Sequence, residues 1–303
     1  MIFMRKISCL VFLLSVVYTA SAQFYLKAGL GYAFPAAATT MDGTGQPYNG
    51  SQTLNTYTTS YSVKPASYSA GLSGNIGIGY MLGEHVGIQL DGNIGLSTKK
   101  YAFTEYNVEI QGVESNVTIT QQAKSPFILV PALVLQTGGD VLNLYTRIGV
   151  ALPLGSKINQ DQSEVNAPGT GALSVYDFTL QIKNSFSPGF AAAAGVRYKI
   201  NDKVSIWGEV SILSMALYIK EADLENFSYN GQSQSLSYVT SPHVIKFSKN
   251  AVVDSNGAQQ PTYSQPFSNV GIQVGVSFNL TEKRPSRARK NEDTEPNKPF
   301  RRR

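Results

Sequence analysis

Charged residues are scarce in this chain, since Lys, Arg, Asp and Glu together make up 15% of its 303 residues, against about 25% in soluble domains. Histidine occurs twice and cysteine once. Because Cys9 lies in an N-terminal segment that we expect to be removed, the mature protein should have no disulfide, no thiol chemistry and no cysteine metal site. After the N-terminus there is no run of about 18 apolar residues, which argues against membrane-spanning helices.

The first 22 residues have the three parts of a secretory signal. Arg5 and Lys6 form a positive region, Leu10–Val17 an apolar core, and Ala20–Ala22 a small-residue cleavage site. We therefore expect export and cleavage before Gln23. An uncleaved membrane anchor is the alternative, and the apolar stretch is short for that role.

The net charge of +5 does not describe the body of the protein. Residues 281–303 hold nine basic and four acidic residues, and the signal removes two more basic ones, so residues 23–280 are nearly neutral. No basic face for nucleic acid remains, and we expect no nucleic-acid partner. The charged tail 281–303 cannot bury a core and is predicted to be disordered in the periplasm.

The chain is rich in Gly, Tyr and Phe, with 27, 17 and 14 residues. This composition is typical of β-strands and of the aromatic residues at the interfaces of membrane barrels. Segments with apolar side chains at every second position recur along it, as in VGIQLDGNIGLS at 86–97. Each segment is long enough to cross a bilayer at a tilt. One of them, 125–136, is apolar on both faces, so its register is ambiguous. The eight segments are 24–34, 68–82, 86–97, 125–136, 141–154, 186–200, 203–219 and 267–280.

Short and long connections alternate strictly between these segments. The short ones, 83–85, 138–140 and 201–202, consist of turn-forming residues. We therefore predict an all-β fold over residues 23–280: an eight-stranded antiparallel up-and-down transmembrane β-barrel with four long extracellular loops and short periplasmic turns. The long loops would be 35–67, 98–124, 155–185 and 220–266.

One long loop shows further alternation. Residues 101–110 and 116–122 could form a hairpin around a turn at 112–115, above the membrane. Its exposed edges could pair with a partner strand, or the hairpin could serve only stability and shielding. If the hairpin joined the wall instead, the barrel would close with ten strands.

In a barrel of this kind the apolar positions face lipid and the alternate positions face the lumen. The alternate positions carry many Gly, Ala and Ser residues, as a narrow lumen requires, together with a few charges. We predict that the charges fill the lumen as a paired network because unpaired buried charge is costly, with Arg197 and Glu209 as a direct pair. A soluble sandwich is the alternative. The predicted network comprises Lys27, Asp91, Arg147, Arg197 and Glu209.

Aromatic residues cluster towards the segment ends, where interface girdles lie in membrane barrels. Ordinary strand propensity also enriches aromatics, so this signal is weak alone. The predicted girdle residues are Tyr25, Tyr32, Phe34, Tyr80, Tyr101, Phe103, Tyr198, Trp207, Tyr218, Phe267 and Phe278.

Five stretches carry a resemblance to a known family: ASAQF at the signal end, FYLKAGLGYAF, LGEHVGIQLDG, INDKVSIWGEV and the last strand VGIQVGVSFNL. With them the chain resembles the small outer-membrane β-barrels of the OmpA/OmpX type, in the "outer membrane protein beta-barrel domain" form common in Bacteroidota. We predict a monomer in the cell outer membrane, in contact with the lipid bilayer and lipopolysaccharide. The resemblance implies insertion by the outer-membrane assembly machinery, which reads the last strand. The matching positions are Val274, Val276, Phe278 and Leu280. Family members often end on that strand with an aromatic residue, whereas this chain continues to residue 303.

Residue patterns for catalysis, cofactors or metals are not apparent. Some small barrels hydrolyse lipid A with His, Ser and a carboxylate; here His243 lies near Ser241, without a supporting motif, and His85 lies in a short turn. No Gly-rich phosphate loop or metal-ligand spacing occurs. We predict no catalytic site, no cofactor and no metal site. The predicted role is structural or surface-binding, towards an unknown extracellular ligand, in adhesion, ligand contact or envelope integrity. The alternatives are a narrow channel and an envelope lipid hydrolase.

Overall fold

The computed structural model of the chain describes residues 23–36, 52–53, 65–110, 113–168, 171–239, 242–252 and 257–280. The predicted signal, 1–22, and the predicted tail, 281–303, lie outside the described residues, so both stay predictions. Among the described residues, no helix is long and apolar enough to cross a membrane.

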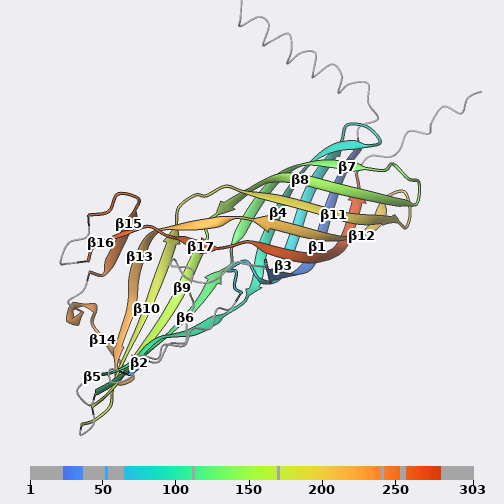
Figure 1. Cartoon of the computed structure of the whole chain (residues 1–303). Helices are drawn as coiled ribbons and strands as arrows, with labels where there is room; N and C mark the ends of the chain where they lie inside the picture. Colours follow the sequence, from blue (N-terminus) through green and yellow to red (C-terminus); the bar gives the residue numbers. More distant parts are fainter. Residues whose placement is uncertain are drawn as a thin grey trace, which may run out of the picture.

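Eight strands close into a barrel in the order β1-β18-β12-β11-β8-β7-β4-β3 (Figure 1). Each pairs in antiparallel fashion with the barrel strands that precede and follow it in the chain, and β1 pairs with β18 to close the ring. The prediction of an eight-stranded up-and-down barrel is confirmed. The strands are β1 (Gln23–Pro35), β3 (Gly71–Met81), β4 (Val86–Thr98), β7 (Phe127–Gln136), β8 (Leu142–Leu154), β11 (Gly189–Lys199), β12 (Val204–Ser214) and β18 (Asn269–Asn279).

Tight turns join β3 to β4, β7 to β8 and β11 to β12, all at one end of the barrel, where β1 begins and β18 ends. In the last of these turns the Asn201 side chain accepts hydrogen bonds from the backbone N–H groups of Lys203 and Val204. Gly138 takes a positive φ of 74° in the turn between β7 and β8, a conformation that glycine adopts at little cost. We call the end of the barrel that carries the three tight turns the short-turn end, and the opposite end of the barrel the distal end.

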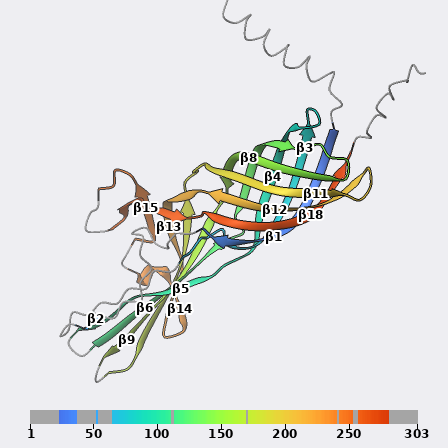
Figure 2. The same cartoon turned by 45° about the vertical axis from the view of Figure 1, so that its right-hand side comes forward.

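The connections at the distal end build a second sheet that extends the barrel outwards (Figures 1 and 2). We call it the distal sheet. Its long strands continue barrel strands after short breaks, and Ser125 and Gly155 bend the chain at two breaks with φ of 40° and 69°. The long strands are β5 (Tyr101–Ile110), β6 (Val113–Lys124), β9 (Lys157–Pro168), β10 (Ser174–Asn184) and β13 (Ala216–Tyr229). Short strands complete it or attach to β13: β2 (Gln52–Thr53), β14 (Gln232–Gln234), β15 (Val244–Ser248), β16 (Gln259–Pro261) and β17 (Ser264–Pro266). A short 3-10 helix, η1 (Leu236–Tyr238), follows β14.

The predicted hairpin of 101–122 exists as β5 and β6, and it belongs to the distal sheet rather than to the barrel wall. β6 begins at Val113, inside the stretch 112–115 that was predicted as the turn, and Ile110 is opposite Val113. The expectation that 155–185 and 220–266 are loops is wrong in large part, since they form β9, β10 and β13.

The apolar positions of the barrel strands face outwards. Ile88, Leu90 and Ile272 are 53%, 41% and 55% exposed, so they do not pack against one another in a dry centre. In β7, whose register was ambiguous from the sequence, the even-numbered side chains face inwards, unlike those of strands such as β4 and β18. The buried residues are Ile128, Val130, Ala132 and Val134. Because Val130 is paired with Asp91 of β4, the two share the lumen face.

Exposed aromatic side chains lie near both ends of the barrel strands. Phe24 and Tyr80 are in contact at the short-turn end, with ring centroids 4.6 Å apart. Four residues predicted for this girdle are instead buried, because their positions in the strands or connections point inwards. They are Tyr25, Tyr101, Trp207 and Phe267.

Candidate functional site

Four buried charges meet in the centre of the barrel. Lys27 of β1, Glu209 of β12, Arg147 of β8 and Asp91 of β4 come from every second strand around the ring. The N···O distances are 3.5 Å for Lys27–Glu209, 2.6 Å for Glu209–Arg147, 3.1 Å for Arg147–Asp91 and 3.6 Å for Asp91–Lys27. The signs alternate around a closed cycle, so each charge has two partners of opposite sign. We call these four residues the charge ring.

The strands between those of the charge ring leave space for it. On β3, a Cβ at Gly77 would lie 2.4 Å from Oδ1 of Asp91, and on β11 a Cβ at Gly195 would lie 2.7 Å from Cβ of Glu209. Any side chain at these positions would displace a member of the ring. The small residues predicted for a narrow lumen therefore have a specific purpose here, which is to let the four charges meet.

Aromatic and amide side chains fill the lumen between the charge ring and the short-turn end. Tyr145 donates a hydrogen bond of 2.8 Å to Glu209, and Gln89 donates one of 2.5 Å to Asp91. Tyr25 donates in turn to Gln89, and the Lys27 ammonium lies 4.2 Å from the ring centroid of Trp207. These contacts add hydrogen bonds to both carboxylates of the charge ring, which helps to offset the cost of burying them. Among the described residues, Oδ1 of Asp91 has no hydrogen-bond partner and faces the Lys27 ammonium at 3.6 Å.

The predicted direct pair of Arg197 and Glu209 is wrong. In the register of β11 and β12, Gly195 is opposite Glu209, and Arg197 is opposite Trp207. Among the ion pairs of the described residues, none joins Arg197 to Glu209. The Arg197 guanidinium lies between two aromatic rings instead, 4.7 Å from the centroid of Tyr25 and 5.3 Å from that of Tyr145.

An apolar core fills the distal end of the lumen and continues into the distal sheet. It joins buried barrel residues such as Val130 and Leu213 to Ile158, Leu217 and Phe267 above them. A cavity of about 70 Å³, lined by apolar residues such as Ile128 and Val130 and by Arg147, lies between the charge ring and the distal end.

The segment before β3 closes over this core. The backbone N–H of Ser67 donates to the Tyr101 hydroxyl, which donates to the Ser67 carbonyl, both at 3.0 Å. The Ser69 hydroxyl donates to the Phe267 carbonyl at 2.7 Å. Burial raises the pKa of Tyr101, which keeps its hydroxyl protonated as a hydrogen-bond donor.

The charge ring and the apolar core lie one after the other along the barrel axis. Each of them obstructs passage through the lumen.

The distal sheet packs one face against the apolar core, and its other face is polar. Hydrogen bonds between side chains on neighbouring strands connect the strands on this polar face. Asp177 of β10 accepts hydrogen bonds from the hydroxyls of Ser163 and Ser228 on its two neighbouring strands. Lys183 pairs with both Glu221 and Asp223 of β13. Hydrogen bonds from its ammonium to these carboxylates raise the pKa of Lys183. Such a ladder orders a surface that sequence reasoning had assigned to loops.

The two histidines that were considered for catalysis do not belong to a common site. His85 lies in the turn after β3, with Nδ1 3.2 Å from the Gln136 carbonyl oxygen. His243 is exposed, with Nε2 3.4 Å from the Val239 carbonyl oxygen, while Ser241 lies outside the described residues. In the described part of the chain, no group of three or more His, Cys, Asp and Glu residues could hold a metal ion.

The last strand presents its predicted signal positions outwards. These side chains lie on the face of β18, and just beyond its end, that carries the other exposed apolar residues. They are Val274, Val276, Phe278 and Leu280.

No protein family model and no curated protein sequence matches the chain. Some solved structures resemble it at low identity. Ail, the attachment invasion locus protein of Yersinia pestis, is 7% identical, with a TM-score of 0.30, over 86% of this chain and 97% of that one. A major outer membrane protein from Thermus thermophilus is 11% identical, with a TM-score of 0.35, over 86% and 99%. CarO of Acinetobacter baumannii is 13% identical, with a TM-score of 0.28, over 83% and 96%. At these values the likeness assigns neither a family nor an activity to this chain.

Proposed function

We propose that the chain is an outer-membrane barrel without enzymatic activity, monomeric, with a structural or surface-binding role outside the cell. The outward face of the barrel strands supports the membrane location. Large apolar side chains are exposed on it strand after strand, with Ile76 65% exposed and Val274 60% exposed. A soluble monomer rarely exposes so extensive an apolar surface, whereas a closed barrel with such a belt satisfies its backbone groups within a bilayer.

The proposed location in the outer membrane also determines which end of the barrel faces the periplasm. The short-turn end and both barrel termini would lie in the periplasm, and the distal sheet would lie outside the cell. The outward side chains of β18 would then be available to the outer-membrane assembly machinery during insertion. Adhesion, ligand contact and envelope integrity are the roles open to a surface of this kind.

The observation that carries the proposed role is the filled lumen beneath an ordered distal sheet. Lys27, Asp91, Arg147 and Glu209 span the barrel centre with ion-pair distances of 2.6 to 3.6 Å. The apolar core above them contains Leu217 and Phe267, both 0% exposed. An eight-stranded barrel has room for little more than its own side chains. The surface outside the barrel is therefore better suited to function than the lumen, and the narrow channel is the weaker candidate.

Planar-bilayer recording tests this role directly. We expect purified protein, with folding verified by heat-modifiable gel mobility, to give no steady ion current, because the ions would have to break the charge ring and cross the apolar core. A general porin in the same bilayer serves as the positive control. A reproducible unit conductance that scales with the amount of inserted protein would favour the channel and reject the role proposed here.

A further inference from the structure

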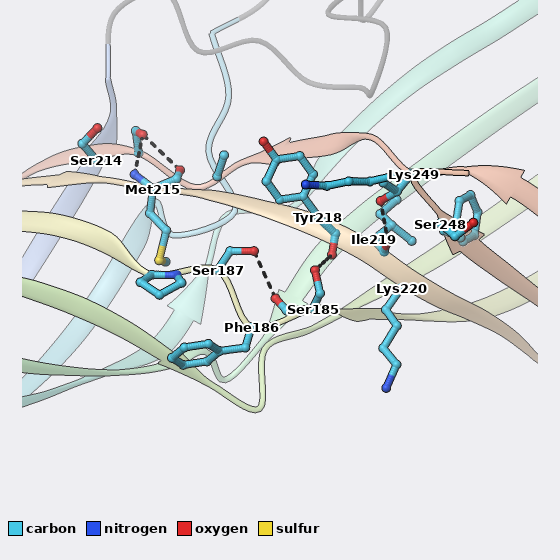
Figure 3. Close-up of a pocket in the computed structure, with 15 residues that line it drawn as sticks. Ser185, Phe186, Ser187, Ser214, Met215, Tyr218, Ile219, Lys220, Ser248 and Lys249 are labelled. Atoms are coloured by element: carbon cyan, nitrogen blue, oxygen red, sulfur yellow. Dashed lines mark hydrogen bonds between the residues drawn. The ribbon is translucent and has the colours of Figure 1, made fainter. Parts of the chain in front are cut away.

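An open groove of about 720 Å³ lies on the outer side of the barrel rim, where β12 passes into β13 (Figure 3). We call it the rim groove. Its wall contains exposed aromatic residues, Phe186 at 62% and Tyr218 at 42% exposure. Two lysines, Lys220 and Lys249, also line it. In Figure 3, Lys249 reaches over β13 towards Tyr218, whereas Lys220 and Phe186 lie on the lower side of β13.

The outward side chains of β12 and β13 change character along the strand. Val210 and Ile212 are apolar and exposed, Tyr218 follows beyond the rim, and Lys220 is the next exposed residue along β13. This order of hydrocarbon, aromatic ring and cation is the order of environments that a strand meets when it leaves a bilayer. The rim groove would therefore lie at the level of the lipid headgroups.

Lys220 is aimed by an irregularity in the strand pairing. Lys183 is opposite Glu221 and the next residue, Asn184, is opposite Ile219, so Lys220 is the extra residue of a β-bulge. Bulges re-aim a side chain and are frequent beside binding sites. An adjoining groove of about 420 Å³ shares Phe186 and Lys220 with the rim groove, so Lys220 stands between two depressions.

The charges of the two groove lysines are not neutralised within the protein. Among the described residues, no hydrogen bond or ion pair joins the ammonium group of Lys220 or Lys249 to another side chain. Lys183, on the neighbouring strand, is instead paired with Glu221 and Asp223. On the side of β13 where Phe186 lies, the unpaired Lys220 ammonium beside an exposed aromatic ring complements an anionic headgroup that carries apolar chains.

We propose that the rim groove binds the phosphate-bearing headgroup of a single membrane lipid, with Lys220 contacting the phosphate and with Phe186, on the same side of β13, packing against the upper part of its acyl chains. This inference rests on the proposed location of the barrel in a membrane. It assigns one lipid a fixed place, beyond the general contact of the belt with lipid. The lysine ammonium suits a phosphate as a compact point charge with three donors.

Native mass spectrometry of the mature chain in uncharged detergent tests this site with phosphatidic acid as the probe. We expect Lys220→Gln to weaken binding of the first phosphatidic acid molecule about fivefold, the effect of one lysine near an anionic surface. The matched control is Lys100→Gln, which removes one exposed lysine outside the groove. This control should bind the lipid as the unmodified chain does.

A diacylglycerol with the same acyl chains, which lacks the phosphate, should bind weakly to every variant. The inference is overturned if the groove variant binds phosphatidic acid as tightly as the unmodified chain, or if the diacylglycerol binds equally well. Recovery of each variant from the outer-membrane fraction, with heat-modifiable mobility, is measured in parallel. If the unmodified chain is not recovered there, the proposed location fails; if it is and the lipid affinities are unchanged, only the lipid site fails.

Discussion

Replacing Glu209 by alanine is expected to lower the free energy of unfolding by about 3–5 kcal/mol, because the change leaves buried cations without a partner. Glu209 lies within 2.6 Å of Arg147 and 3.5 Å of Lys27, and all three side chains are at most 3% exposed. Urea-induced unfolding in lipid vesicles measures the effect. The single tryptophan, Trp207, contacts Lys27 in the lumen and so reports on this region by its fluorescence.

Two further variants separate loss of pairing from loss of a side chain. Replacing the whole charge ring by apolar residues, in Lys27→Met/Asp91→Leu/Arg147→Met/Glu209→Leu, should cost less than Glu209→Ala alone, because no charge is then left unpaired. Asp202→Ala removes an exposed partner of Lys199 and should cost less than about 1 kcal/mol. If Glu209→Ala is as mild as Asp202→Ala, the ring is not a buried ion network.

Replacing Ile76 by arginine is the second change with a large expected effect. Ile76 lies at the middle of β3 and is 65% exposed. In a soluble protein such a surface change would be nearly neutral. On a lipid-facing position near the bilayer centre, arginine should destabilise the barrel by about 2–4 kcal/mol, since its charge must leave water.

The matched control for Ile76→Arg is Val244→Arg in β15. Val244 is also exposed, at 42%, but belongs to the distal sheet, beyond the apolar belt. We expect this variant to unfold within about 0.5 kcal/mol of the unmodified chain. Equal tolerance of both substitutions, measured by the same urea titration in vesicles, would mean that the belt faces water.

The barrel could be predicted from sequence because alternation repeats over the barrel strands other than β7, which is apolar on both faces, and because the connections alternate in length. Alternation fixes which side chains share a face, which is why the four charges at odd positions could be assigned to one lumen. It does not fix register across the barrel. The pairing of Arg147 with Glu209 depends on β8 and β12, which are not neighbours in the sheet, so neighbouring-strand reasoning selected Arg197 instead.

The distal sheet was missed because its strands break the simple pattern. β9 has polar side chains on both faces, with Gln160 on one face and Asp161 on the other. In β13 the bulges at Lys220 and Glu225 shift the parity twice, so no continuous alternation survives. β10 does alternate, with apolar residues from Tyr176 to Ile182, and that signal could have been used.

Nitroxide scanning of β18 in lipid vesicles tests most directly whether the apolar face meets hydrocarbon. Because the only cysteine, Cys9, precedes the predicted cleavage site, one introduced cysteine at a time can be labelled selectively. Labels at Val270, Ile272, Val274 and Val276 should collide with dissolved oxygen and be shielded from a water-soluble nickel complex, whereas labels at Gln273 and Ser277 should be protected from both. Ready nickel access at the even positions would contradict the account, because those side chains would then face water.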